Sequence, residues 1–408
     1  MRKALLATAS GAALLAAGPA LAADMLSVGI SGSMEQWIGV VGIEKTDDDG
    51  KKANDDALPS SDLGAKDGVM QASDSEIHFR GSLEADNGLK FSVKVELEGN
   101  STGNQIDESQ LTVSGEFGQI VLGAEDNAQT LTHHGVRSTG AVGINCGDAG
   151  AWVDGIDGCS PDGFGTSGHG FGDKNQISYF SPRVSGVQFG ATYIPNTGQE
   201  ASTAKLNDND HDAFAMGGNY VGEFGGANVA FSAGYYQAAQ TVPKQTEVKF
   251  YDAGESAART PKTFSDAATY TANKIDEATF ANFGLQVGFG AFSFDVAYGD
   301  YESGRYMASE NAEGETVMVE DNKGDAETMA AGAMYSDGPM AISLGFIGTE
   351  YGNGTDQALV ELGAGYTLAP GAVWKSSLFM AEKNGTDKTN GAYTTEGTGF
   401  VTGIAISF

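Results

Sequence analysis

The 408-residue chain carries 54 Asp and Glu residues against 23 Lys and Arg residues, which gives a formal net charge of −31. This balance excludes nucleic acid as a partner, because phosphate binding needs clustered basic residues. No segment approaches the roughly 18 consecutive apolar residues of a membrane-spanning helix. The negative mean hydropathy fits a soluble protein and equally a transmembrane β-barrel, whose inward and outward residues alternate.

The first residues have the pattern of an export signal. Arg2 and Lys3 precede an apolar stretch over residues 4–17, and a run of small residues ends in Ala20-Leu21-Ala22. This pattern predicts a secretory signal peptide over residues 1–22 that is cleaved after Ala22. The apolar stretch is too short for an anchoring helix. We therefore expect a single exported domain over residues 23–408.

Alternation of apolar and polar residues recurs along the chain and predicts β-strands. The first clear case covers residues 76–84, where Ile77, Phe79 and Leu83 alternate with polar residues, and the next covers residues 89–98. The same pattern returns at 187–193, 292–299, 340–346 and in the last residues up to Phe408. A soluble β-sandwich also alternates, so the alternation alone does not choose between the two classes.

The connections between these strands come in two lengths that alternate along the chain. Short turns are expected near residues 84–88, 115–118, 182–186, 222–226, 288–290, 336–339 and 368–371. Long connections are expected near residues 43–73, 99–107, 125–173, 195–211, 238–276, 302–325, 351–356 and 383–396. Such a sequence of turns and loops is typical of an outer-membrane barrel. We predict an all-β fold: a sixteen-stranded antiparallel transmembrane barrel with short periplasmic turns and long extracellular loops.

Several segments, in order, resemble the Gram-negative porin family. They are Phe79-Arg80-Gly81-Ser82 with Asn87-Gly88-Leu89-Lys90, Val113-Ser114-Gly115-Glu116-Phe117-Gly118 with Leu122-Gly123, and Asn175-Gln176-Ile177-Ser178-Tyr179 with Ser181-Pro182 and Ser185-Gly186. The resemblance implies a homotrimer in the outer-membrane lipid that passes ions and small hydrophilic solutes and has no enzymatic activity. It also implies that the third long loop folds into the pore. Phe408, with Ile404 and Ile406, resembles the signal that the barrel assembly machinery reads.

The residues expected at the pore constriction carry both signs of charge. On inward positions of the wall, Arg80, Lys90 and Lys94 oppose Glu76, Glu96 and Glu98. The inward loop supplies further acids, among them Asp148, Asp154 and Asp157. The sequence departs from the family pattern at Glu76, Asp107 and Ala124, which stand near positions where family members carry basic residues. Since carboxylates that line an aqueous pore favour cations, we expect moderate cation selectivity.

Cysteines, histidines and short motifs add little further chemistry. Cys146 and Cys159 lie in the third long loop, and in an exported chain a disulfide is the leading interpretation. The acidic run from Asp208 to Asp212 lacks the glycine and glutamate of a calcium-binding EF-hand, so loose binding of divalent cations is the only cofactor-like property expected. His133 and His134 could add positive charge at low pH or simply be exposed loop residues.

Two alternative functions stay open from the sequence alone. The first is a substrate-specific outer-membrane channel or an adhesin that uses its acidic loops. The second is a barrel enzyme, which would need an activated serine or a carboxylate pair, and no spacing in the chain points to one.

Overall fold

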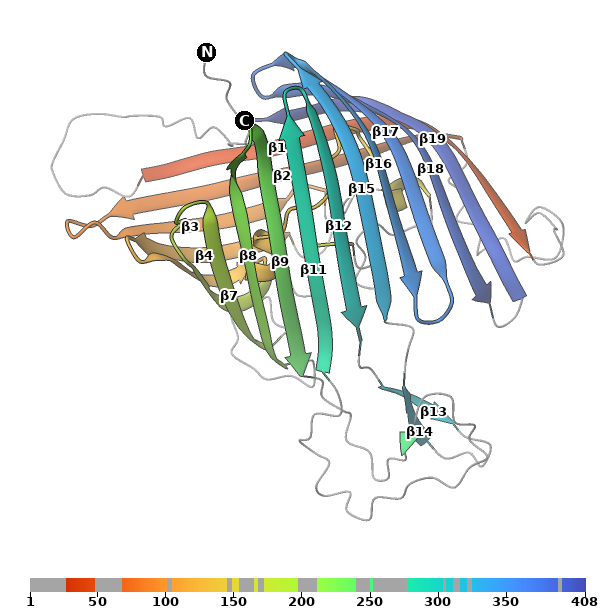
Figure 1. The fold of residues 1–408 in the computed structure, drawn as a ribbon, viewed down its shortest axis with the longest axis horizontal. Helices are drawn as coiled ribbons and strands as arrows, with labels where there is room; N and C mark the ends of the chain where they lie inside the picture. The colour runs from red at the N-terminus through yellow and green to blue at the C-terminus, as the bar shows by residue number, and fades with distance from the viewer. Residues whose placement is uncertain are drawn as a thin grey trace.

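The computed structural model describes residues 27–47, 68–100, 105–144, 149–153, 165–167, 172–196, 211–239, 250–251, 277–303, 306–310, 316–320, 325–387 and 391–408. Sixteen antiparallel strands form one closed barrel (Figure 1), which confirms the predicted fold class. The barrel strands are β1 (Ser27–Asp47), β2 (Gly68–Glu84), β3 (Lys90–Glu98), β4 (Ile106–Gly115), β5 (Gly118–Glu125), β6 (Lys174–Phe180), β7 (Val187–Asn196), β8 (His211–Phe224), β9 (Ala227–Ala239), β11 (Glu277–Phe289), β12 (Phe292–Glu302), β15 (Ala326–Asp337), β16 (Met340–Tyr351), β17 (Asp356–Ala369), β18 (Ala372–Asp387) and β19 (Gly391–Ser407).

Each barrel strand pairs with the barrel strands that precede and follow it in the chain, and β1 closes the ring on β19. The β1–β19 register runs from Ser33 opposite Ser407 to Asp47 opposite Tyr393. At the seam, the Gly32 amide donates to the Phe408 carbonyl at 2.9 Å and the Phe408 amide donates to the Gly32 carbonyl at 3.0 Å. Because the ring is closed, it leaves no strand edge unpaired.

The short turns require tight backbone geometry. In the turn between β4 and β5, Gly115 pairs with Gly118, and Gly118 has a φ of +107°. A side chain at Gly118 would collide with the Phe180 carbonyl oxygen. Glycine is therefore required there by the backbone conformation and by the neighbouring strand.

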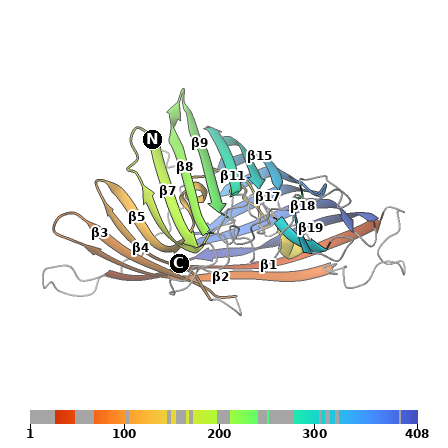
Figure 2. The ribbon, with the colours of Figure 1, turned by 90° about the horizontal axis from the view of Figure 1, so that it is seen from below.

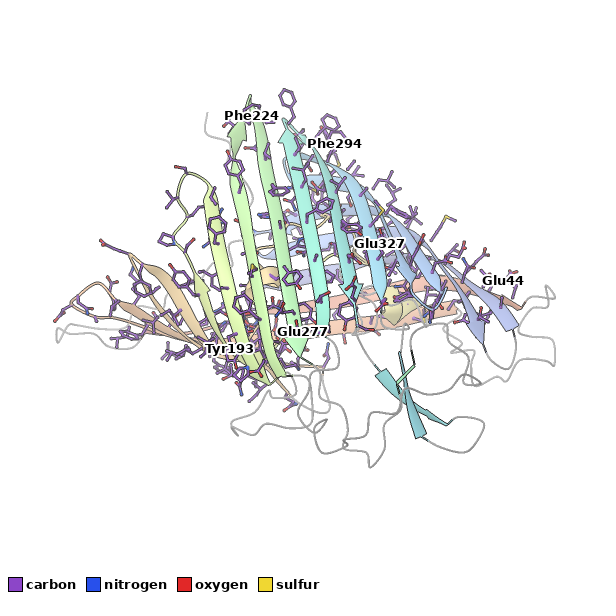
Figure 3. The ribbon with its side chains drawn as sticks, turned by 60° about the horizontal axis from the view of Figure 1, so that its bottom comes forward. Glu44, Tyr193, Phe224, Glu277, Phe294 and Glu327 are labelled. Carbon is purple, nitrogen blue, oxygen red and sulfur yellow. The ribbon has the colours of Figure 1, made fainter. Side chains whose placement is uncertain are left out.

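The two faces of the strands differ as a membrane barrel requires. Phe79, Phe294 and Leu344 point outward and are 42%, 61% and 55% exposed. Phe224 and Phe294 lie towards the rim that carries the chain ends, whereas Tyr193, Glu277 and Glu44 lie towards the opposite rim (Figure 3). An outward band of large apolar residues is what lipid contact favours.

Two features of the long connections were not predicted. The segments β10 (Phe250–Tyr251), β13 (Tyr306–Glu310) and β14 (Thr316–Glu320) form a separate three-stranded sheet in the order β10-β14-β13. This small sheet lies beyond the rim opposite the chain ends (Figure 1). The loop between β5 and β6 contains two four-residue helices, α1 (Ala128–Leu131) and α2 (Ala149–Trp152). No helix in the described part of the chain is long and apolar enough to span a membrane.

Candidate pore constriction

The connection between β5 and β6, residues 126–173, is here called the internal loop. It is described at residues 126–144, 149–153, 165–167 and 172–173. It begins at α1, where the Asn127 side chain accepts from the amides of Gln129 and Thr130 at 2.9 and 3.3 Å, as a helix cap does. The part of the chain that contains α1 and α2 lies within the ring of strands (Figure 2). The prediction that the third long loop folds inward is confirmed.

Polar side chains of the barrel wall hold the backbone of the internal loop. On β8, Asn219 donates to the Thr132 carbonyl at 3.0 Å. On β9, the Ser232 hydroxyl accepts from the His134 amide at 2.9 Å. On β11, Gln286 donates to the Gly135 carbonyl at 2.7 Å. Buried backbone groups need partners, and here the wall supplies them strand by strand.

Arg137 and Asp295 form an ion pair between the loop and β12. Asp295 is 3% exposed, and its carboxylate accepts from Nε of Arg137 at 2.9 Å and from Nη2 at 2.7 Å. The backbone amide of Arg137 donates to the same carboxylate at 3.1 Å. A two-point contact of this kind fixes both the position and the orientation of the Arg137 side chain, so Arg137 holds the internal loop against β12.

Glu361 on β17 is a second anchor. Its carboxylate is fully buried and accepts from the amides of Val142 and Gly143 at 3.2 and 2.9 Å. It also accepts from the hydroxyl of Ser377 at 2.6 Å and from that of Ser138. Four donors converge on one carboxylate, which compensates for its burial by direct hydrogen bonds.

Glycines on the inner wall make room for the loop. A Cβ atom at Gly39, Gly332 or Gly345 would lie 2.5 Å from a side-chain atom of the loop residues Trp152, Val136 and Ile144 respectively. The loop therefore packs directly on the wall backbone at these points. The apolar loop residues join wall residues of β1, β12 and β15–β19 in one buried cluster. This cluster and the anchors above hold the internal loop against β8, β9, β11, β12, β15–β19 and β1.

The charged wall is the name used here for a group of inward residues on β2–β5. It comprises Glu76, His78, Arg80, Lys94, Glu96, Glu98, Asp107, Glu108 and Glu125. The loop contacts described above do not involve the members of this group on β2, β3 and β4. Within the described residues, two bases, Arg80 and Lys94, therefore face five carboxylates on β2–β4, and Glu125 on β5 adds a sixth.

Lys94 is surrounded by carboxylates. Its Nζ atom lies 3.1 Å from Glu96, 3.1 Å from Glu125 and within hydrogen-bonding distance of Glu108. Arg80 lies 3.7 Å from Glu96 and donates to the Ser31 hydroxyl at 2.7 Å. The positive charge of both bases is thus directed at neighbouring carboxylates and serine, which weakens any path for anions along them.

The remaining predicted constriction residues lie elsewhere or are not described. Lys90 sits at the periplasmic end of β3, 3.5 Å from Glu84, with both side chains more than 60% exposed. It is therefore separate from the charged wall. Asp148, Asp154 and Asp157 lie outside the described residues, as do Cys146, Cys159 and the predicted signal peptide. The disulfide stays a prediction.

The two loop histidines are packed against the wall. His133 contacts Thr166 at 3.2 Å and Ser232 at 3.3 Å. Burial, and then the neighbouring charge of His134, lowers the pKa of His133 to about 4. Burial, followed by Arg183 and Arg137, also lowers the pKa of His134. Both rings are neutral at physiological pH, so they add no positive charge to the pore there.

Two sets of side chains in the charged wall have the spacing of cation ligands. They are Glu76, His78 and Glu96, and Glu76, Glu98 and Asp107, with ligand atoms within 4.8 Å of one another in each set. In the first set, an Arg80 nitrogen lies 2.8 Å from Nδ1 of His78, and this positive charge opposes a dication. The acidic loop at 208–212, for which loose cation binding was expected, lies outside the described residues.

The anchors Asp295 and Glu361 were not identified from the sequence. Both occupy inward positions of alternating strands, where their neighbours are small or uncharged residues. An isolated carboxylate on such a face indicates that hydrogen-bond donors inside the barrel pair with it. The repeated inward glycines give the same signal for a close packing partner.

The chain matches the Gram-negative porin family over residues 7–386, and it belongs to this family. Family and fold are those of outer-membrane channel proteins. No curated protein matches the chain.

Several solved porin structures share the fold. An anion-selective porin from Comamonas acidovorans is 16% identical, with a TM-score of 0.55, over 94% of this chain and all of that one. A porin refined at 1.8 Å resolution is 15% identical, with a TM-score of 0.55 and the same coverage. A loop-deletion mutant of OmpT from Vibrio cholerae is 13% identical, with a TM-score of 0.52, over 95% of this chain and all of that one. At these identities the likeness concerns the fold alone.

Proposed function

We propose that this porin forms a water-filled channel for passive diffusion of ions and small hydrophilic solutes, with a moderate preference for cations. The observation that carries the preference is the set of contacts around Lys94, which is paired with three carboxylates at once. The only other base of the charged wall, Arg80, shares Glu96 with it. A passage lined by net negative charge concentrates cations and repels anions.

The preference is measured by the reversal potential in a planar bilayer under a KCl gradient. We expect a sign that corresponds to potassium permeating faster than chloride. The variant Glu76→Gln/Glu98→Gln removes two wall charges that are not paired with Lys94 and should move the permeability ratio towards one. Glu84→Gln, at the periplasmic turn, is the matched control and should leave the ratio unchanged. A reversal potential showing chloride preference would mean that Arg80 and Lys94 dominate the pore.

Liposome swelling with sugars of graded size tests the diffusion function itself. A general pore admits solutes at rates that fall smoothly with size. Fast entry of one solute among others of equal size would favour the substrate-specific channel instead.

We also propose that the mature protein is a homotrimer, after removal of residues 1–22. The support is family membership together with exposed aliphatic residues on the first strands, such as Val28, Ile30 and Val69 at 72%, 63% and 73% exposed. Assembly into the membrane would use the terminal Phe408, which is 62% exposed. Cross-linking in mild detergent should give trimers, and the recovery of monomers alone would contradict this proposal.

A further inference from the structure

Arg80 is the more exposed of the two bases on the charged wall. Its side chain is 39% exposed, against 21% for that of Lys94. The two residues are register partners on β2 and β3, a position in which like charges repel each other. Lys94 is drawn towards Glu108 and Glu125 on β4 and β5. Arg80 is therefore the base whose position permeating ions sense most directly.

The Arg80 guanidinium is held away from its own level in the sheet. Its register partner on β1 is Gly29, where an added Cβ atom would meet nothing within 4 Å, so the lumen is open at that level. Instead, Nη1 of Arg80 donates to the Ser31 hydroxyl at 2.7 Å, and Nη2 lies 2.8 Å from Nδ1 of His78. Ser31 and His78 are themselves register partners. The guanidinium therefore leans towards the rim opposite the chain ends.

The contact with Arg80 determines which ring nitrogen of His78 carries the proton. An arginine side chain has donors only, so Nδ1 of His78 is the acceptor in this contact. The ring proton is then on Nε2, which lies 2.8 Å from the Glu76 carboxylate. The ring thus turns its acceptor nitrogen to the cation and its donor nitrogen to the anion. Both charged neighbours stabilise this orientation of the ring.

In the held position, the charge of Arg80 is partly offset by a carboxylate. Nη2 of Arg80 lies 3.7 Å from Glu96, which is the register partner of His78 on β3. The effect of a charge on an ion falls with the distance between them. A guanidinium that left Glu96 for the open space beside Gly29 would therefore add to the positive potential that permeating ions meet. The contact with His78 decides which of the two positions Arg80 takes.

We infer that His78 is a positioning residue that sets the ion preference of the pore by holding the Arg80 guanidinium against the wall. This inference rests on the proposed diffusion function and names a residue that tunes it. His78 in the orientation described carries no net charge, so its effect on ions is exerted through Arg80. Loss of the Nδ1 acceptor releases the guanidinium into the lumen, where it attracts chloride and repels potassium.

The reversal potential of the whole channel under a KCl gradient, at neutral pH, tests this inference. In His78→Leu, the ratio of potassium to chloride permeability should fall about twofold. In His78→Asn, the amide oxygen can take the place of Nδ1 as acceptor, so most of the parent ratio should be restored. Arg80→Gln alone should raise the ratio. In the Arg80→Gln background, His78→Leu should have no further effect, because the residue through which it acts is gone.

The matched control is Ser82→Ala, at the inward position on the other side of Arg80, where the hydroxyl pairs with Ser27 at 2.6 Å. It should keep the parent ratio, and heat-modified gel mobility verifies that all variants fold. An unchanged ratio in His78→Leu, no recovery in His78→Asn, or the same fall in the Arg80→Gln background would overturn the inference. A parent that prefers chloride would contradict the proposed cation preference alone, because the inference concerns the direction of the shift and its dependence on Arg80.

Discussion

Removal of the Glu361 carboxylate should loosen the internal loop without unfolding the barrel. In Glu361→Ala, the Gly143 amide loses its 2.9 Å bond to a charged acceptor. A lost bond of this type costs about 2 kcal/mol. The Val142 amide keeps the Ser377 hydroxyl at 3.0 Å as a partner, so its loss is smaller. Since 1.4 kcal/mol corresponds to a factor of ten, the population in which residues 138–143 leave the wall should rise roughly thirtyfold.

Single-channel recording in planar bilayers measures this change. We expect Glu361→Ala to show higher open-channel current noise and additional conductance levels, because the loop lines the pore. Glu361→Gln retains an oxygen that can accept from both amides, so it should lie much closer to the parent.

The matched control is Glu350→Ala, on the outward face of the neighbouring strand β16, which should leave the noise unchanged. Thermal unfolding in detergent should shift little in all three variants, because the ladder of backbone hydrogen bonds in the barrel is intact. If Glu361→Ala had the noise and conductance of the parent, the carboxylate would not be what holds the loop.

Two further predictions follow from the same structure, and a third rests on the sequence. Arg137→Met leaves the buried Asp295 unpaired and should destabilise the docked loop by about 3 kcal/mol, while Arg137→Met/Asp295→Asn should recover most of this loss. Current noise and protease sensitivity of the loop measure the docking in each variant. Equal behaviour of the single and double variants would contradict the pairing. The pKa of His133 is lowered to about 4, so the neutral ring contributes roughly 3 kcal/mol to docking of the loop above pH 6.5, and this contribution is lost as pH falls from 6.5 through 4. The open-channel current noise should therefore rise in acid in the parent and much less in His133→Asn. A parent channel that is equally quiet at pH 4 and pH 7 would refute this. Cys146 and Cys159 should be inaccessible to thiol labelling in unreduced, denatured protein, whereas two labelled thiols would dismiss the disulfide.

The sequence by itself determined the architecture. The period-two alternation and the alternating lengths of connections are local properties, so they specified sixteen strands and their inward and outward faces. The third connection was expected to enter the pore only from the resemblance to the porin family. Strand ends moved by a few residues: β1 continues to Asp47 and β2 begins at Gly68, inside the first predicted loop. Backbone pairing across the sheet extends these strands beyond the alternating pattern.

Only the tertiary structure decided which residues act on one another inside the barrel. Arg137 and Asp295 are separated by 158 positions in sequence, and Glu361 meets Val142 across 219. No local pattern encodes such pairs, because they depend on the path of the loop through the lumen and on the register of the strands between the loop and its partners. Arg80 and Lys94 were predicted as bases of the pore constriction. That Glu96, Glu108 and Glu125 pair with these bases follows from cross-strand distances, which the register of β2 to β5 sets.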